Sequence, residues 1–181
     1  MERQHLSIDA LRQLVQDDDL EVNQKLKALK YIISIKEKAS SLVSELISLI
    51  ERNNYPEILS FAIEALGEIG SASEPAVAVI GTILDDYKQY DSYDYIQNYA
   101  ANSLGKINSS QAVPYLLRAL ESPDSQGPCL AAIYALARLR SKAITAVPAL
   151  QDLLKKVDYK DYYPAIDKAL TEILKNQSHK T

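Results

Sequence analysis

The side chains that most often carry enzyme chemistry are scarce in this chain of 181 residues. The two histidines, His5 and His179, lie near opposite ends, and the single cysteine, Cys129, stands among apolar neighbours. One thiol excludes an internal disulfide and a thiolate-only metal cluster, and two distant histidines give little support for a metal site or a general base. The five glycines form no cluster of the kind that cradles a phosphate. We therefore expect a chain that is not an enzyme and that binds no cofactor or metal.

Tyrosine is the over-represented residue type, with 12 copies against one Phe and no Trp. Four tyrosines and four aspartates fall between positions 85 and 95, and the candidate partner contacts among them are Tyr87, Tyr90, Tyr93 and Tyr95. Tyrosine is enriched in binding surfaces because it offers a large amphipathic area at a low entropic cost. Two interpretations stay open: an exposed Tyr-rich edge that binds a partner, or tyrosines that begin the next helix and pack onto the repeat below. A second cluster precedes the last predicted helix and consists of Tyr159, Tyr162 and Tyr163.

An internal repeat in the sequence predicts the helices that position these side chains. A pattern of small–Leu–x–x–Ile/Leu recurs at Leu29, Leu66, Leu104, Leu136 and Leu170, at spacings of 37, 38, 32 and 34 residues. Each copy ends a segment with apolar residues at helical spacing. A second apolar helix follows, and three of its copies carry a proline near the start, Pro75, Pro114 and Pro148, where the missing N–H is tolerated. Residues 70–73 and 108–110 are expected to be turns, with Ser73 and Ser110 as N-caps.

A helix–turn–helix unit that repeats every 32–38 residues predicts an α-solenoid. The copies resemble HEAT repeats, and specifically the bacterial HEAT-like repeats named after phycobilisome lyases, whose consensus reads AAxALGxIG followed by AVPxLxxxL. That consensus is matched by residues 61–70 with 75–84, 99–107 with 112–120, and 131–139 with 146–154. The resemblance covers residues 55–175 well and 18–52 loosely. It implies an all-α fold of about five HEAT-like helix–turn–helix repeats wound into a right-handed superhelix.

We expect the whole chain to form one solenoid. Residues 1–17 would form an N-terminal capping helix. Residues 159–176 would form a half-repeat at the C-terminal end, which is either a cap or one half of a unit whose next helix comes from a partner or from a longer parent chain. The repeats between them are predicted at residues 18–52, 55–86, 93–121 and 127–157. A polar outer face on the last helix suits a terminal repeat.

The second helices carry the other candidate partner contacts. The resemblance implies that these helices line the concave face of the solenoid, which is the usual partner surface. When Val43, Val77, Val113 and Val147 are aligned, the outward positions stack into ladders, and one ladder consists of Ser48, Thr82, Arg118 and Asp152. Tyr115 lies one turn before Arg118, and Tyr and Arg dominate the energetics of interfaces. The predicted partner-binding positions on these helices are therefore Thr82, Tyr115, Arg118 and Asp152; the alternative interpretation is a solvated helix face.

The resulting hypothesis is a non-catalytic module that binds a protein or peptide on its concave face or its Tyr-rich edge. A bilin lyase-like, chromophore-handling role is the first alternative and rests on the repeat subtype alone. Nucleic-acid binding is the second alternative, but the net charge is −4 and the tight basic cluster at residues 138–142 lies at a turn. Charge is uneven, since residues 53–105 hold one lysine against eight carboxylates, whereas residues 106–181 hold eleven cations against seven.

The sequence also bears on location and assembly. The N-terminus lacks the apolar stretch of a signal peptide, and the longest apolar run, residues 39–50, is 12 residues long and contains Glu45. A lone cysteine suits a reducing compartment. We therefore expect a cytoplasmic protein without membrane or nucleic-acid partners, present as a monomer or a weak homodimer.

Overall fold

A computed structural model describes residues 6–53, 55–85, 94–121, 126–156 and 162–175, and within them it contains helices and no strand. The first helices of the repeats are α2 (Val22–Ile35), α4 (Pro56–Ile69), α6 (Asp94–Ile107), α8 (Gln126–Leu139) and α10 (Tyr163–Leu174). The second helices are α3 (Val43–Arg52), α5 (Val77–Asp85), α7 (Val113–Leu120) and α9 (Val147–Lys155), and α1 (Ile8–Gln16) precedes them all. The predicted all-α solenoid is confirmed.

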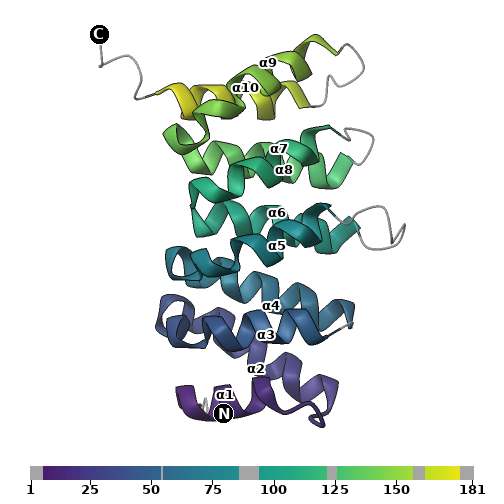
Figure 1. Cartoon of the computed structure of the whole chain (residues 1–181), viewed down its shortest axis with the longest axis vertical. Coiled ribbons are helices and arrows are strands. Elements are labelled where there is room, and N and C mark those ends of the chain that lie inside the picture. Colours follow the sequence, from purple (N-terminus) through teal and green to yellow (C-terminus); the bar gives the residue numbers. More distant parts are fainter. Residues whose placement is uncertain (1–5, 54, 86–93, 122–125, 157–161, 176–181) are drawn as a thin grey trace.

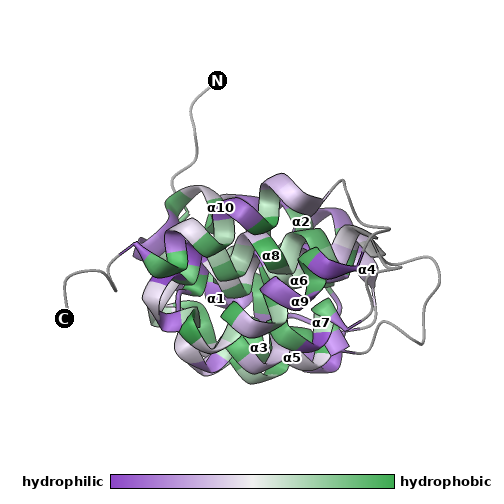
Figure 2. Cartoon of the chain, turned by 90° about the horizontal axis from the view of Figure 1, so that it is seen from above, coloured by the Kyte–Doolittle hydropathy of each residue, from purple (hydrophilic) through white to green (hydrophobic). Residues whose placement is uncertain are grey.

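The helices form two layers that run the length of the stack. In Figure 1 the chain climbs from α1 at the bottom to α10 at the top, with α3, α5, α7 and α9 in front of the first helices. Figure 2 looks down this stack and shows α3, α5 and α7 along one side, with α2, α4, α8 and α10 toward the other. Each first helix packs against the first helices before and after it, so this layer is continuous through the molecule.

Small residues bring the first helices close together. A Cβ on Gly67 of α4 would lie 2.6 Å from the Oγ of Ser103 on α6, and a Cβ on Gly105 of α6 would lie 2.8 Å from the Cα of Ala135 on α8. The leucines of the five-residue pattern fill the space between repeats, and Leu29, Leu66, Leu104 and Leu136 are fully buried. Leu170 is half-buried because no further first helix packs on α10 within the described residues.

The connection between the two helices of a repeat is built the same way four times. It is a 3₁₀ segment: η1 (Lys36–Leu42), η2 (Gly70–Ala76), η4 (Ser110–Ala112) or η5 (Arg140–Ala146). The residue that follows each first helix has a positive φ, 52° at Lys36, 79° at Gly70, 58° at Asn108 and 52° at Arg140. Glycine adopts this conformation at no steric cost, whereas other residues are strained there.

The expected turns and N-caps are wrong in detail. Residues 70–73 begin a 3₁₀ helix, and the buried Ser73 has no hydrogen-bond partner for its Oγ among the described residues. Ser109, not Ser110, is the N-cap of η4: its Oγ accepts from the backbone N of Gln111 at 3.2 Å and donates to Glu74 of the preceding repeat at 2.6 Å. The sequence pattern placed the connection but not its helical geometry.

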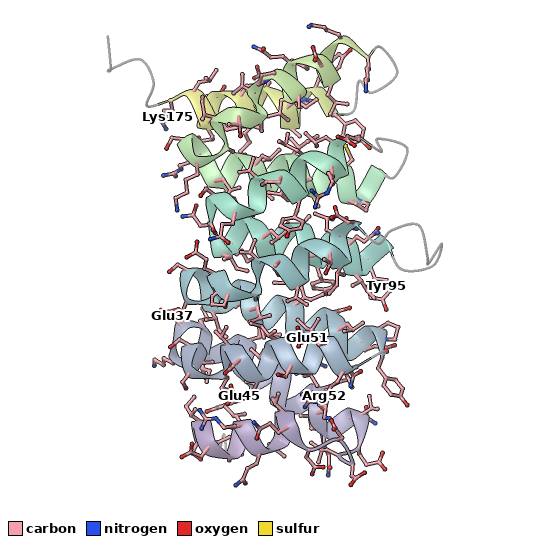
Figure 3. The ribbon with its side chains drawn as sticks, in the orientation of Figure 1. Glu37, Glu45, Glu51, Arg52, Tyr95 and Lys175 are labelled. Atoms are coloured by element: carbon pink, nitrogen blue, oxygen red, sulfur yellow. The ribbon has the colours of Figure 1, made fainter. Side chains whose placement is uncertain are left out.

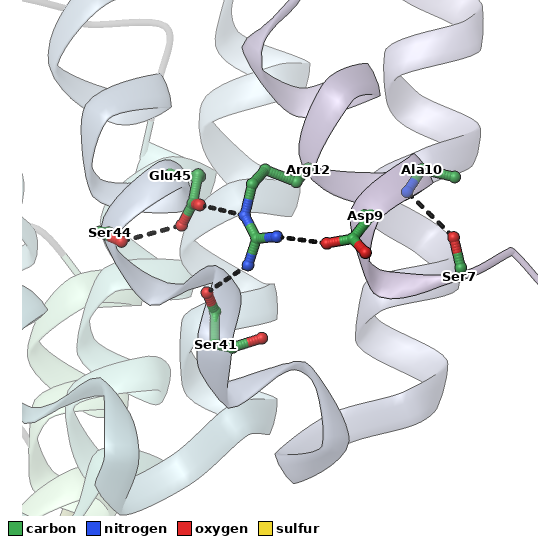
Figure 4. Close-up of polar contacts among 7 residues, drawn as sticks. All are labelled: Ser7, Asp9, Ala10, Arg12, Ser41, Ser44 and Glu45. Carbon is green, nitrogen blue, oxygen red and sulfur yellow. Dashed lines mark hydrogen bonds and ion pairs between the residues drawn. The ribbon is translucent and has the colours of Figure 1, made fainter.

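Helix α1 is joined to the first repeat by hydrogen bonds and ion pairs of Arg12 (Figure 4). Arg12 of α1 donates from Nε to Glu45 of α3 at 2.6 Å and from Nη1 to Asp9 at 2.6 Å, and its Nη2 reaches the carbonyl of Ser41 at 3.3 Å. The hydrogen bond that Arg12 donates to Glu45 raises the pKa of Arg12. Within the described residues, no helix is both long enough and apolar enough to cross a membrane.

The positive φ at Lys36 leads to a stability prediction. We expect Lys36→Gly to be more stable than Lys36→Ala by about 1 kcal/mol, because both variants lose the ion pair to Glu68 but only glycine relieves the backbone strain. The measurement is urea unfolding followed by circular dichroism. Gly70→Ala is the matched control and should lose about 1 kcal/mol, since a Cβ there meets nothing within 4 Å and the cost is conformational. Equal stability of the two Lys36 variants would contradict the strain argument.

Candidate functional site

Helix α7 carries the candidate pair Tyr115 and Arg118 on its outward side. Pro114 occupies the first turn, where no intrahelical hydrogen bond is lost, and Val113, Leu116 and Leu120 point into the core. The helical period then turns Arg118 to solvent and leaves Tyr115 half-buried at the boundary with α5. The two side chains therefore lie on one face, as the sequence predicts.

The ring of Tyr115 rests on Gly81 of the preceding repeat. A Cβ at position 81 would lie 2.3 Å from a carbon of this ring, so only glycine leaves room for it. Gly81 itself is buried. The contact joins α5 to α7, where a large side chain fills the space between two second helices.

Arg118 is held from two sides. Its guanidinium carbon stacks 4.7 Å from the centroid of the Tyr115 ring, a cation–π geometry. Its Nε donates to the Oδ1 of Asp85 on α5 at 2.9 Å, and its Nη2 donates to Oδ2 of the same carboxylate, a bidentate pair that links adjacent repeats. The hydrogen bonds that Arg118 donates to Asp85 raise the pKa of Arg118 above its usual value. The Arg118 side chain nevertheless remains 47% exposed, so it presents a fixed positive charge to solvent.

The other two predicted contacts on the second helices stand apart from this pair. Thr82 is exposed on α5, and its Oγ1 donates to the carbonyl of Val79 one turn earlier at 2.8 Å. Asp152 on α9 is paired with Lys155 of the same helix at 2.7 Å, and this hydrogen bond lowers the pKa of Asp152. Each polar group is satisfied within its own helix, so the ladder is an aligned row rather than one cluster.

The Tyr-rich edge is only partly within the described residues. Tyr87, Tyr90 and Tyr93 lie outside them. Tyr95 is 40% exposed in the first turn of α6, at the edge of the stack where Figure 3 labels it. Tyr55, at the N-terminus of α4, is 59% exposed and was not singled out from the sequence. Tyr162 of the second predicted cluster is buried and belongs to the core.

Cys129 on α8 is a buried thiol. Burial raises its pKa from 9.0 to about 11, so the thiol stays protonated at neutral pH. The thiolate is the nucleophilic form of cysteine, and the environment of Cys129 therefore does not support a role as a nucleophile. Within the described residues, no group of three or more His, Cys, Asp or Glu side chains is placed to hold a metal ion.

Comparison with known proteins agrees with this architecture. Residues 87–166 match the sequence profile of HEAT repeats. The match covers 80 of the 181 residues, so the likeness to HEAT repeats is shown for this part of the chain. Its fold is similar to a chain in the structure of the complex of CpcE and CpcF of phycocyanin lyase from Nostoc sp. PCC7120, with a TM-score of 0.74, 20% sequence identity, and coverage of 98% of this chain and 69% of that one. No curated protein matches the sequence. The predicted resemblance to HEAT-like repeats of the phycobilisome-lyase type is confirmed.

The expectation that the chain is not an enzyme is contradicted. A solved structure that is similar in fold over 98% of this chain, at 20% sequence identity, comes from a phycocyanin lyase. The scarcity of His and Cys excludes only chemistry carried by those side chains within this chain. A solenoid also exposes a long surface on which a substrate and a second subunit can meet, and composition does not report on that surface.

Sequence analysis did not identify Gly81 and Asp85 as the contacts of Tyr115 and Arg118. Gly81 fits no turn and sits inside a helix, which is a signal that a neighbouring group approaches closely. Asp85 stands 33 positions before Arg118, about one repeat length, so the ladder alignment places them in adjacent repeats. The alignment alone could have found this cross-repeat ion pair.

The packing of the Tyr115 ring on Gly81 leads to a second stability prediction. Gly81→Ala should destabilise the chain by about 1–2 kcal/mol, because the clash with the ring outweighs the better helix propensity of alanine. Chemical denaturation measures the change. In the Tyr115→Ala background the ring is absent, so the same Gly81→Ala substitution should be neutral or stabilising. A similar loss of unfolding free energy in both backgrounds would show that the Tyr115 ring does not pack against Gly81.

Proposed function

We propose that the chain binds a protein partner along the face of its second helices, with Tyr115 and Arg118 at the centre of the contact. The observation that carries this proposal is the exposed guanidinium of Arg118, held between the ring of Tyr115 and the carboxylate of Asp85. A side chain that is already fixed loses little conformational entropy on binding. Tyrosine and arginine are also the residue types most enriched among energetic hot spots.

Two further observations support a protein partner. HEAT repeats offer extended surfaces rather than enclosed pockets, which suits macromolecular ligands. The solved structure with a similar fold contains two subunits, CpcE and CpcF, in one complex. The pair on α7 also lies between α5 and α9 of the second-helix layer, so a partner can contact repeats on both sides of it.

The experiment is quantitative affinity capture from a lysate of the source cells, with each bound protein measured by mass spectrometry. Tyr115→Ala/Arg118→Ala should lower the recovery of the specific partner at least about tenfold, as expected when a hot spot worth about 2 kcal/mol is truncated. Asp85→Asn keeps both side chains but frees the guanidinium, so it should give a smaller loss. Circular dichroism confirms that each variant is folded.

A matched variant separates the helix face from the Tyr-rich edge. Tyr55→Ala/Tyr95→Ala also removes two exposed side chains, both of them tyrosines, but these lie at the N-terminal ends of α4 and α6. If the loss of partner follows this edge variant and not the α7 variant, the second-helix face is the wrong surface. Identical partner sets for all variants would reject both surfaces.

A second candidate function is a lyase-like role in attaching a bilin to a phycobiliprotein. The observation that favours it is the similarity of fold, over 98% of this chain, to a phycocyanin lyase subunit complex. The test mixes the purified protein with bilin and apo-phycobiliprotein and records the visible absorption spectrum. A protein-dependent change in the visible band, together with a covalent bilin adduct on the acceptor by mass spectrometry, is the expected result.

Controls make this second test decisive. Cys129→Ser should leave the activity unchanged, because the buried thiol is protonated and does not reach solvent. Without an adduct above the rate of the uncatalysed mixture, the lyase-like role is rejected for the chain acting alone, while the protein-binding proposal stands on its own experiment.

A further inference from the structure

A groove on the opposite layer from Tyr115 collects positive charge. It has a volume of about 820 Å³ and lies where α6, α8 and α10 meet η5. Five cationic side chains line it against one carboxylate, Glu172, and they are Lys106, Arg138, Arg140, Lys142 and Lys168. Only the run of basic residues in 138–142 is visible as a cluster in the sequence. Lys106 and Lys168 come to it from other repeats.

The charges of this groove are incompletely neutralised by the protein. Lys106 donates to Glu68 at 2.6 Å, and Arg140 approaches Glu172 at 3.6 Å. Lys142 is bound to the carbonyl oxygen of Asn108 at 2.6 Å, which carries no full charge. Neither Arg138 nor Lys168 forms an ion pair with any residue that the structure describes. The groove thus holds three cations with a partner in the protein, and two, Arg138 and Lys168, without an ion pair among the described residues.

Backbone strain is retained at two lining positions. Asn108 and Arg140 both have positive φ values, 58° and 52°, where the corresponding residue of an earlier repeat is Gly70. Glycine would relieve that strain at either position. The chain instead keeps an amide and a guanidinium at the rim of the groove. Lys36, at the same position of the first repeat, also has a positive φ of 52° and lies outside the groove, so this conformation belongs to the repeat connection and is not specific to the groove.

We propose that this groove binds an acidic segment of a protein partner. Carboxylates are the natural ligands of a guanidinium fork and of lysine ammonium groups. Tyr134, 42% exposed, and Ala137 supply apolar surface in the same groove for the carbon atoms of a peptide. This site lies on the first-helix layer and is separate from the contact proposed around α7.

The surroundings favour a short acidic peptide over a nucleic acid. The groove is confined to three helices, and Glu172 lies within it. A duplex would need cations along several repeats, whereas residues 53–105 carry one lysine against eight carboxylates and would repel a long polyanion. A short segment can reach the cations without meeting that acidic region.

The test measures binding of a fluorescein-labelled oligoglutamate peptide to the full chain by anisotropy. Binding should be saturable at low ionic strength and should weaken as salt is added. Arg138→Gln/Lys168→Gln should weaken it about tenfold, since both charges are free of structural ion pairs. Lys27→Gln/Lys38→Gln removes the same charge from exposed positions on α2 and η1, and it should leave the affinity within about twofold of wild type.

Additional measurements locate the bound peptide on the chain and identify the class of ligand. Because the chain has no tryptophan, Tyr134→Trp places a single indole in the groove, and its fluorescence should change on peptide binding. Tyr115→Ala/Arg118→Ala should bind the peptide as wild type does, so this readout is independent of the contact around α7. Equal weakening by both pairs of Gln substitutions would overturn the proposal. So would absence of saturable binding, or tighter binding of a short single-stranded DNA than of the peptide.

Discussion

The close approach of neighbouring first helices is the constraint on which the rest of the structure depends. At Gly67 and Gly105 there is no room for a Cβ, because Ser103 and Ala135 of the next repeat already occupy that space. Close backbone approach lets the leucines of the first four repeats, Leu29, Leu66, Leu104 and Leu136, reach the next repeat and become fully buried. The stability of the stack then builds up repeat by repeat through these interfaces, as in other solenoids. A change in one interface alters the position of every surface beyond it.

The second-helix layer is built differently, and that difference matters for function. At its junction between α5 and α7 the contact is made by larger and more polar groups: the Tyr115 ring over Gly81 and the ion pair between Arg118 and Asp85. Such groups serve two purposes at once, since they hold the repeats in register and remain partly open to solvent. On the first-helix layer, long cations of α6, α8 and α10 line the groove. The two layers thus offer a partner two chemically distinct surfaces.

Much of the architecture was predictable because repetition averages out local ambiguity. Five copies of one leucine pattern define the first helices more firmly than any single copy would. The 3₁₀ connections were not predictable in the same way, because Lys36, Asn108 and Arg140 adopt a backbone conformation that their residue types disfavour. Tertiary packing on both sides imposes that conformation. Ser109 rather than Ser110 became the N-cap for a related reason, since its hydroxyl is also bound to Glu74 of the preceding repeat.

The sites were predictable only where the sequence supplied a register. Aligning the second helices placed Arg118 beside the previous repeat, and its partner Asp85 follows from that alignment. The groove had no such signal, because Lys106, Arg138 and Lys168 belong to three different first helices and only stacking brings them together. The non-enzyme expectation failed for the same physical reason. Composition counts the side chains that one chain contains, whereas a solenoid acts through the arrangement of surfaces, and through what a partner places on them.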